Sequence, residues 1–218
     1  MILVALGILC FAHPAASQTV VDKMLVSVSD NVRADLITYS DLLWQLALQP
    51  GSPLEAPRKE DLNQILQILI EQRLIALEAE RLPTTAPTEA EVAAEIRRIV
   101  LQFPSAAAFE TRLRLVGFDS TDDPNFRRII EQRVAIEKYL DFRFRSFVVV
   151  TPEDEQKFYE GTFAARFRQA NPGVVLPPIE QVQRRINEEL TEIKIAADID
   201  SFLEQARARA VVTILNPL

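Results

Sequence analysis

Histidine, cysteine and glycine are scarce in this sequence, and their scarcity excludes several classes of protein. Among 218 residues there are one His, one Cys and 5 Gly. So few glycines argue against Gly-rich phosphate-binding loops and against tightly turned all-β folds. A single cysteine leaves no disulfide within the chain, so packing alone must hold the fold together. Hydrophobic residues make up 48% of the chain, which is enough for a substantial core.

The N-terminal segment has the pattern of a secretory signal peptide. Residues 1–12 form an almost unbroken apolar run, which is too short for a bilayer span of roughly 20 residues. Ala15 and Ser17 place small residues at the −3 and −1 positions of a cut before Gln18. No Lys or Arg precedes the run, and lipid attachment at Cys10 is an alternative. We expect a periplasmic or otherwise exported protein, cleaved between Ser17 and Gln18.

Cleavage would leave a mature chain without histidine or cysteine, because His13 and Cys10 both lie in the removed segment. A Ser-His-Asp triad, an imidazole base, a thiol nucleophile and an ordinary zinc site are then excluded. The 24 basic and 31 acidic residues all lie in the mature chain and give it a net charge of −7. An acidic chain without a long basic stripe is a poor nucleic-acid binder. We therefore expect no catalytic residue, metal, cofactor or nucleic-acid partner.

Hydrophobic periodicity and capping residues predict a mainly α fold with short β-strands at both ends of the chain. Strands are expected over 24–28, 36–38 and 211–215, and helices are expected to start near 40, 59, 88, 105, 123 and 151, with a long helix over 179–209. Each terminal strand needs a partner for its backbone groups. We expect 211–215 to pair with 24–28, which would make the C-terminal helix part of the N-terminal domain.

Several side chains are expected to cap or line these helices. Ser40 is predicted to cap the first helix, and Thr88 forms a capping box with Glu91. Gly117 stands where a left-handed helix end is needed. The second helix, predicted over 59–81, has one polar member in its apolar stripe, Arg73. On the last helix the side chains expected to face inward are Val182, Ile186, Leu190, Ile193, Ala197, Ile199 and Phe202.

Seven segments of the mature chain, taken in order, resemble one known family. They are VVDKMLVSV (20–28), ITYSDL (37–42), LIEQRLIALEAERL (69–82), TEAEV (88–92), FRRIIEQR (126–133), VTPEDE (150–155) and the stretch 186–215. Together they are similar to the N-terminal chaperone domain and the returning C-terminal helix and strand of the SurA family. That family comprises periplasmic chaperones and parvulin-type prolyl isomerases.

The segment between Tyr159 and Pro178 departs from the family, because it is far shorter than a parvulin domain. It contains only Gly161 and Gly173 and no histidine, whereas the family's isomerase domain is Gly-rich and has histidines in its catalytic pocket. The resemblance therefore implies a chaperone without the isomerase domain. The expected divisions are a signal peptide (1–17), a helical chaperone core (18–150), a helix and connection in place of the isomerase domain (151–178), and a helix and strand that return to the core (179–218).

An aromatic cluster supplies the candidate client-binding residues. Arginines with flexible stems lie among the rings, and together they could line a groove for extended apolar peptide. The alternative interpretation is that the rings form core and the arginines a solvated face. The client-binding candidates are Phe142, Phe144, Phe147, Phe158, Tyr159, Phe163 and Phe167.

Acidic pairs such as Glu153 and Glu155 are interpreted as a solvated helix face or as partners of a helix dipole.

The favoured hypothesis is a non-enzymatic, ATP-independent periplasmic chaperone that binds unfolded or exported polypeptides through an apolar groove. Its expected partners are such clients, among them outer-membrane proteins, and it would have no stable membrane span after signal cleavage. Two other hypotheses are a structural or assembly partner that forms a homodimer without binding clients, and an enzyme that retains prolyl isomerase activity.

Overall fold

The computed structural model describes residues 22–30, 32–79 and 86–218. The signal peptide predicted for residues 1–17 and its cleavage site lie outside the described residues. The strands are β1 (Met24–Ser29), β2 (Ala34–Thr38) and β3 (Val211–Ile214). The helices are α1 (Tyr39–Ala47), α2 (Lys59–Ala79), α3 (Glu89–Val100), α4 (Ala106–Leu115), α5 (Pro124–Arg143), α6 (Pro152–Phe158), α7 (Ala164–Ala170) and α8 (Ile179–Arg209), with a 3₁₀ turn at Arg145–Phe147 and a π-helical turn at Tyr159–Phe163. The fold is therefore mainly helical, as the periodicity predicts.

The first and last strands belong to one antiparallel sheet of order β2-β1-β3. β1 pairs with β3 so that Val26 lies opposite Ile214 and Ser29 lies opposite Val211. Just beyond this ladder, the N–H of Leu215 donates to the carbonyl of Leu25 at 2.8 Å. The predicted pairing of the two terminal strands is confirmed. One face of β1 and β2 packs on α2, whereas the residues of β3 are exposed.

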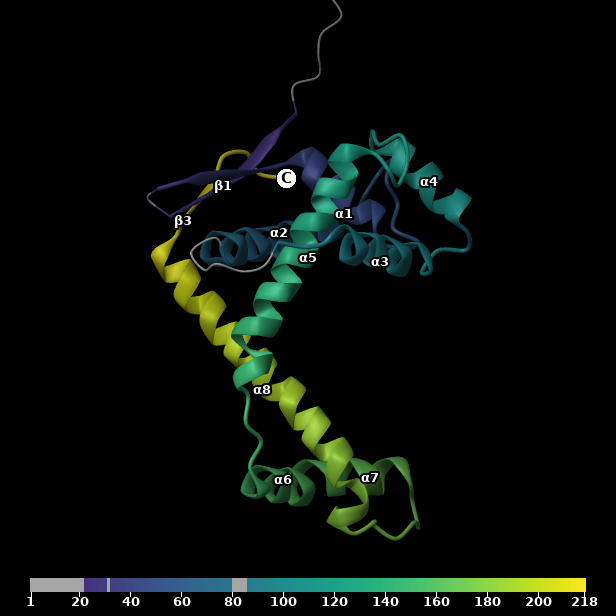
Figure 1. The fold of residues 1–218 in the computed structure, drawn as a ribbon, viewed down its shortest axis with the longest axis vertical. Coiled ribbons are helices and arrows are strands. Elements are labelled where there is room, and N and C mark those ends of the chain that lie inside the picture. The colour runs from purple at the N-terminus through teal and green to yellow at the C-terminus, as the bar shows by residue number, and fades with distance from the viewer. Residues whose placement is uncertain (1–21, 31, 80–85) are drawn as a thin grey trace, which may run out of the picture.

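Two bodies of unequal size are connected by a narrow waist (Figure 1). The upper body contains the sheet, α1 to α5 and the end of α8, and the lower body contains α6, the π-helical turn, α7 and the start of α8. We define the waist as residues 141–150, at the end of α5 and after it, together with residues 191–202 of α8. No helix in the described part of the chain is both long and apolar enough to cross a membrane.

Three clusters of buried apolar side chains form the core. The first lies between the sheet, α1 and α2, and the second lies among α3, α4 and α5. The third joins α6 and the π-helical turn to α8. Ile186 and Leu190 of α8 belong to the third cluster, whereas Ala206 belongs to the first. One helix thus contributes to the core of both bodies.

The predicted helix ends are largely confirmed, and the exceptions have local causes. The capping box of Thr88 is present, and Gly117 has a φ of 95° after α4. Thr38 rather than Ser40 caps α1, because its hydroxyl and the Asp41 carboxylate each accept a hydrogen bond from the other residue's backbone N–H. The helix that is predicted to start near 123 would end near residues 147–150 by its apolar pattern, but α5 ends earlier, at Arg143, where the chain tightens into the 3₁₀ turn.

The face of α8 that is buried differs in part from the predicted one. Ile193 is 48% exposed and Ala197 is also exposed, whereas Ile195 is buried. The reason is that α8 changes partners along its length, from α6 at its start to α2 near its end. The side chains between these two contacts lie in the waist, where no other element covers a continuous apolar stripe of α8.

Arg112 of α4 connects the second core to the end of α1. Its guanidinium donates hydrogen bonds of 3.0, 3.2, 3.1 and 2.9 Å to the carbonyls of Leu46, Ala47, Gln49 and Ser52. A helix leaves its last carbonyls without intrahelical donors, and here one side chain supplies them. Arg112 therefore fixes the position of α1 and the following turn relative to α4.

Substitution of Arg112 tests this connection. We expect Arg112→Gln to lower the free energy of unfolding by about 3 kcal/mol, because hydrogen bonds to a charged group contribute roughly 1.5–3 kcal/mol each and the carbonyls lose their donors. Arg114→Gln is the control on the same helix, where Arg114 forms an exposed pair with Glu110 at 3.9 Å, and its effect should stay within about 0.5 kcal/mol. Equal urea-unfolding midpoints for the two variants would contradict the assignment.

Glu91 connects the start of α3 to α5. Its carboxylate accepts hydrogen bonds from Nζ of Lys138 at 2.8 Å and from the N–H of Thr88 at 2.7 Å. The ammonium of Lys138 and the donors of Thr88 lower the pKa of Glu91 from 4.5 to about 2. The folded state therefore binds this proton more weakly than the unfolded state does.

The lowered pKa gives a defined pH dependence of stability. Because the pKa of Glu91 is depressed on folding, its contribution is present above about pH 4.5 and is lost as the pH falls through about 2. Glu91→Gln should thus be less stable than the wild type at neutral pH, and the difference should disappear at low pH. Urea unfolding across this range measures it, with Glu204→Gln, an exposed position, as control. A difference that is independent of pH would contradict the prediction.

Candidate functional site

The seven predicted client-binding residues are divided between the waist and the lower body. In the waist, Phe142 is 56% and Phe147 is 69% exposed, and their rings meet edge to face with centroids 6.3 Å apart. Phe144 is buried instead, and its ring contacts Phe202 of α8 with centroids 5.5 Å apart. Two of the three predicted waist aromatics are therefore accessible to a partner, and the third attaches the end of α5 to α8.

The other four predicted residues belong to the lower body. Phe158 and Phe163 are buried in its core, whereas Tyr159 and Phe167 are only partly buried. Tyr159, Phe163 and Phe167 follow one another at intervals of four, and their rings stack with centroid distances of 5.8 and 5.9 Å. The structure therefore gives Phe158 and Phe163 the packing role that the alternative interpretation expects, and it does not bring the seven residues into one groove.

A shallow hollow lies beside the exposed aromatic pair, between the end of α5 and the middle of α8. Its volume is about 280 Å³, and it is lined by Arg143, Phe144, Phe147, Asp198, Ser201, Phe202 and Gln205. Three phenyl rings thus stand beside charged and hydroxyl groups in one depression. Such a mixture can bind an apolar group while a few polar contacts orient it. Phe202 also lines this hollow. The sequence predicts only that its side chain faces inward on α8 and does not indicate a binding role.

Charged side chains fix the waist segments to α8. The guanidinium of Arg145 donates to the Glu192 carboxylate at 2.6 and 3.1 Å. Nζ of Lys194 donates to the carbonyl of Val149 at 2.9 Å and to the Asp154 carboxylate at 2.7 Å. Lys194 is the main reason why the pKa of Asp154 lies well below its usual range. The chain that carries the exposed Phe147 is therefore held against α8 on both sides of this residue.

Glu155 departs from the expectation of a solvated acidic face. It is buried, and its carboxylate accepts hydrogen bonds from the side-chain amides of Gln183 at 2.8 Å and Asn187 at 2.7 Å. Both amides come from α8, so Glu155 attaches α6 to that helix. Its exposed neighbour Glu153 forms an ion pair with Lys157 at 2.7 Å and matches the predicted solvated face.

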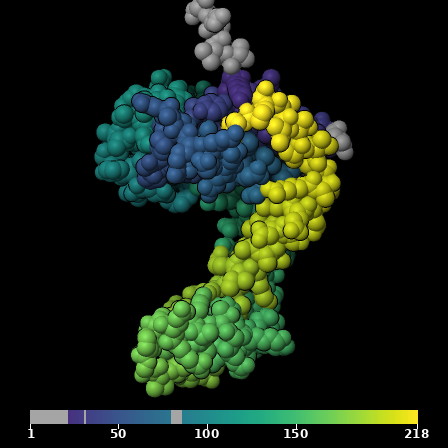
Figure 2. All heavy atoms as spheres, turned by 180° about the vertical axis from the view of Figure 1, so that it is seen from behind, coloured from purple at the N-terminus to yellow at the C-terminus, as the bar shows by residue number. Residues whose placement is uncertain are grey.

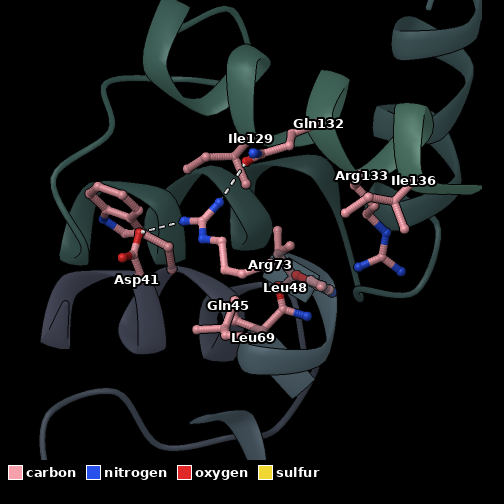
Figure 3. A pocket seen from close by; sticks show the side chains of 11 residues that line it. Asp41, Gln45, Leu48, Leu69, Arg73, Ile129, Gln132, Arg133 and Ile136 are labelled. Carbon is pink, nitrogen blue, oxygen red and sulfur yellow. Dashed lines mark hydrogen bonds and ion pairs between the residues drawn. The ribbon is translucent and has the colours of Figure 1, made fainter. Parts of the chain in front are cut away.

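A second, polar pocket lies in the upper body where α1, α2 and α5 meet (Figure 3). Arg73 of α2 lies at its centre, where one Nη donates to the Gln132 amide oxygen at 3.1 Å and the other lies 4.0 Å from Asp41 Oδ1. The pocket has a volume of about 50 Å³ and adjoins a wider hollow of about 430 Å³ that these three residues also line. The sequence signal for this site is the single charged residue within the apolar stripe of α2.

Neither a known protein family nor a curated protein matches this sequence. Over residues 22–30, 32–79 and 86–218, no group of three or more His, Cys, Asp or Glu side chains could hold a metal ion. The groups that line the waist hollow and the polar pocket include aromatic rings, guanidinium groups, carboxylates, amides and a hydroxyl. These groups bind partners through apolar contact, ion pairing and hydrogen bonds.

Alanine substitution distinguishes packing rings from accessible rings. Phe163→Ala should lower the free energy of unfolding by about 3–5 kcal/mol, because the ring is buried and its removal leaves a cavity. Phe142→Ala should change it by no more than about 0.5 kcal/mol, because the ring is 56% exposed. Urea unfolding monitored by circular dichroism measures both. Losses of similar size would show that Phe142 is also part of the core.

Proposed function

We propose that this protein is an ATP-independent periplasmic chaperone that holds unfolded, exported polypeptides by apolar contact at its waist. The observation that carries the proposal is the accessible pair of rings, Phe142 and Phe147, beside the hollow between α5 and α8. Large aromatic side chains are commonly buried, and neighbouring exposed rings are typical of surfaces that bind a partner. Aromatic residues also dominate the energetics of protein interfaces.

The apolar surface of the waist is large enough for weak and reversible capture. Val149 and Ile193 are 69% and 48% exposed and lie in the same region as the two rings. Full burial of an apolar side chain contributes roughly 1.5–3 kcal/mol, and these four begin about half to two-thirds exposed, so their burial supplies about 4–7 kcal/mol before the cost of association. The net affinity of this surface alone is therefore weak, which suits a chaperone that must release its client.

Shape and charge also support this function. Figure 2 shows that the waist is narrower than either body, so an extended chain can pass beside it without meeting the bulk of the protein. The net charge of −7 repels other copies of the protein and keeps complexes with apolar clients dispersed. The long side chain of Arg143, whose guanidinium lies 5.4 Å from the centroid of the Phe144 ring, adds apolar stem beside the rings.

The resemblance to the SurA family agrees with this proposal. The C-terminal helix and strand return to the N-terminal domain, as the resemblance implies, through the pairing of β3 with β1. The segment between Tyr159 and Pro178 forms the π-helical turn, α7 and a short connection. All three belong to the lower body. We therefore propose the chaperone function of the family and not its prolyl isomerase activity, with unfolded outer-membrane proteins among the clients.

Suppression of aggregation tests the proposal. The wild type at stoichiometric amounts should reduce light scattering when a denatured outer-membrane β-barrel protein is diluted into buffer. The double variant Phe142→Ser/Phe147→Ser should lose at least half of this effect, because the waist then has no accessible rings for the client to contact. The matched control is Leu101→Ser/Val175→Ser, which removes two apolar side chains that are 83% and 88% exposed at other places.

The outcomes separate the three hypotheses. Full suppression by both double variants would place client binding elsewhere and overturn the assignment to the waist. No suppression by a several-fold excess of wild type, together with dimerisation that depends on dilution, would favour an assembly partner. Turnover of an X-Pro peptide above the uncatalysed rate in a coupled assay would favour the isomerase.

A further inference from the structure

The polar pocket around Arg73 has donors that the protein itself does not use. A guanidinium carries five N–H donors, and in Arg73 one of them reaches Gln132 at 3.1 Å. Nε of Arg73 is buried and has no hydrogen-bond partner among the described residues. The nearest carboxylate oxygen, Oδ1 of Asp41, is 4.0 Å away, beyond hydrogen-bond distance. Arg73 is only partly buried, with 20% of its side chain exposed, so its unused donors can meet an acceptor that enters the pocket.

Asp41 does not supply that acceptor, because its carboxylate serves another purpose. Oδ2 of Asp41 accepts hydrogen bonds from the N–H of Thr38 at 2.8 Å and from the Thr38 hydroxyl at 3.2 Å. These bonds form the capping box at the start of α1 and hold the carboxylate on that side of the pocket. Figure 3 shows the guanidinium of Arg73 between Asp41 and Gln132, with Arg133 further along the pocket.

Two arginines are the donors that a ligand meets in the two adjoining hollows. Besides Arg73, the exposed Arg128 lines the wider hollow and forms no ion pair within the described part of the chain. Arg133 pairs with Glu95 outside the pocket, since its Nε lies 3.0 Å from the Glu95 carboxylate. The carboxylates of Asp41 and Glu131 balance the other two arginines. An acid would therefore be bound by direct hydrogen bonds from a guanidinium and not by a surplus of positive charge.

The sizes of the two hollows limit the ligand. The inner pocket of about 50 Å³ has room for a few water-sized atoms, which is the size of a carboxylate group. The wider hollow of about 430 Å³ is lined in part by apolar groups of Trp44, Pro87, Ile129 and Ala135. A ligand with a carboxylate at one end and an apolar portion next to it matches both compartments.

We infer that Arg73 binds the carboxylate of such a ligand. The guanidinium fork offers paired donors to the two carboxylate oxygens, and the apolar portion lies against Trp44 and Ile129. Two sources have this chemistry: the C-terminal end of a polypeptide and a small free carboxylic acid. The site is independent of client capture at the waist.

Trp44 supplies a direct readout, because it is the single tryptophan of the chain and lines both hollows. Its indole N–H donates to the carbonyl of Val116 at 3.0 Å, which keeps the ring in place. The probes are sodium hexanoate, an N-acetylated tripeptide of apolar residues with a free C-terminal carboxylate, and the same tripeptide as its C-terminal amide. Each is titrated into the full mature protein at constant ionic strength while tryptophan fluorescence is recorded.

We expect saturable binding of the free-acid peptide, at least tenfold tighter than that of the amide. Arg73→Gln should weaken the free acid at least tenfold, and Arg73→Lys should weaken it less, because lysine keeps the charge but loses the fork. Arg97→Gln, an exposed position on α3 outside the pocket, should bind as the wild type does. Circular dichroism of each variant shows that it is folded.

Two outcomes decide the source of the ligand, and two overturn the site. Weaker binding of hexanoate than of the peptide assigns the pocket to polypeptide ends, and equal or tighter binding assigns it to small carboxylic acids. Equal affinity for the free acid and the amide, or no binding of any probe, would overturn the inference. Folded Arg73→Gln and Arg73→Lys variants that both bind the free acid like the wild type would overturn it as well.

Discussion

The backbone ladder between β1 and β3 fixes the end of α8 to the upper body, and the position of the lower body depends on it. Near that end, α8 is also held by Leu203 and Ala206 in the first core, by Phe202 against Phe144, and by two ion pairs, from Arg207 to Glu71 and from Arg209 to Glu78. These charged groups are partly exposed, and such pairs contribute little. The other end of α8 forms the core of the lower body. Because α8 is one continuous helix, the pairing of its end with the sheet helps to set the position of the lower body on the other side of the waist.

The waist and the polar pocket illustrate two ways of presenting a binding surface. At the waist, Phe142 and Phe147 are accessible because the chain there has few neighbours, and Arg145 holds that chain against α8. Selectivity there is low, since apolar contact has no direction. In the polar pocket three helices enclose Arg73, and the directions of its donors are set by Gln132 and by packing. A site of that kind selects its ligand by geometry as well as by charge.

The local patterns and the pairing of the two terminal strands could be predicted from the sequence, whereas the burial of individual side chains by distant elements could not. The capping box of Thr88 and the bounds of α8 are local patterns, and both were predictable. Which of Phe142 and Phe144 is buried depends on the 3₁₀ turn that ends α5 and on Phe202, far along the chain. The burial of Glu155 likewise depends on amides supplied by α8. For the polar pocket, the sequence contained one signal, a charge within an apolar stripe.

The sheet has a consequence for the order of events during folding. Most of the chain lies between β1 and β3, so a polypeptide synthesised from its N-terminus presents β1 long before its second neighbour arrives. Until then Val26 and Val28, which are buried in the finished molecule, lie on a strand that has one open edge. Contacts between such remote segments form late and slowly. A newly synthesised copy is therefore itself a molecule with an unfinished sheet, open for a time to the same kind of association that it is proposed to prevent in others.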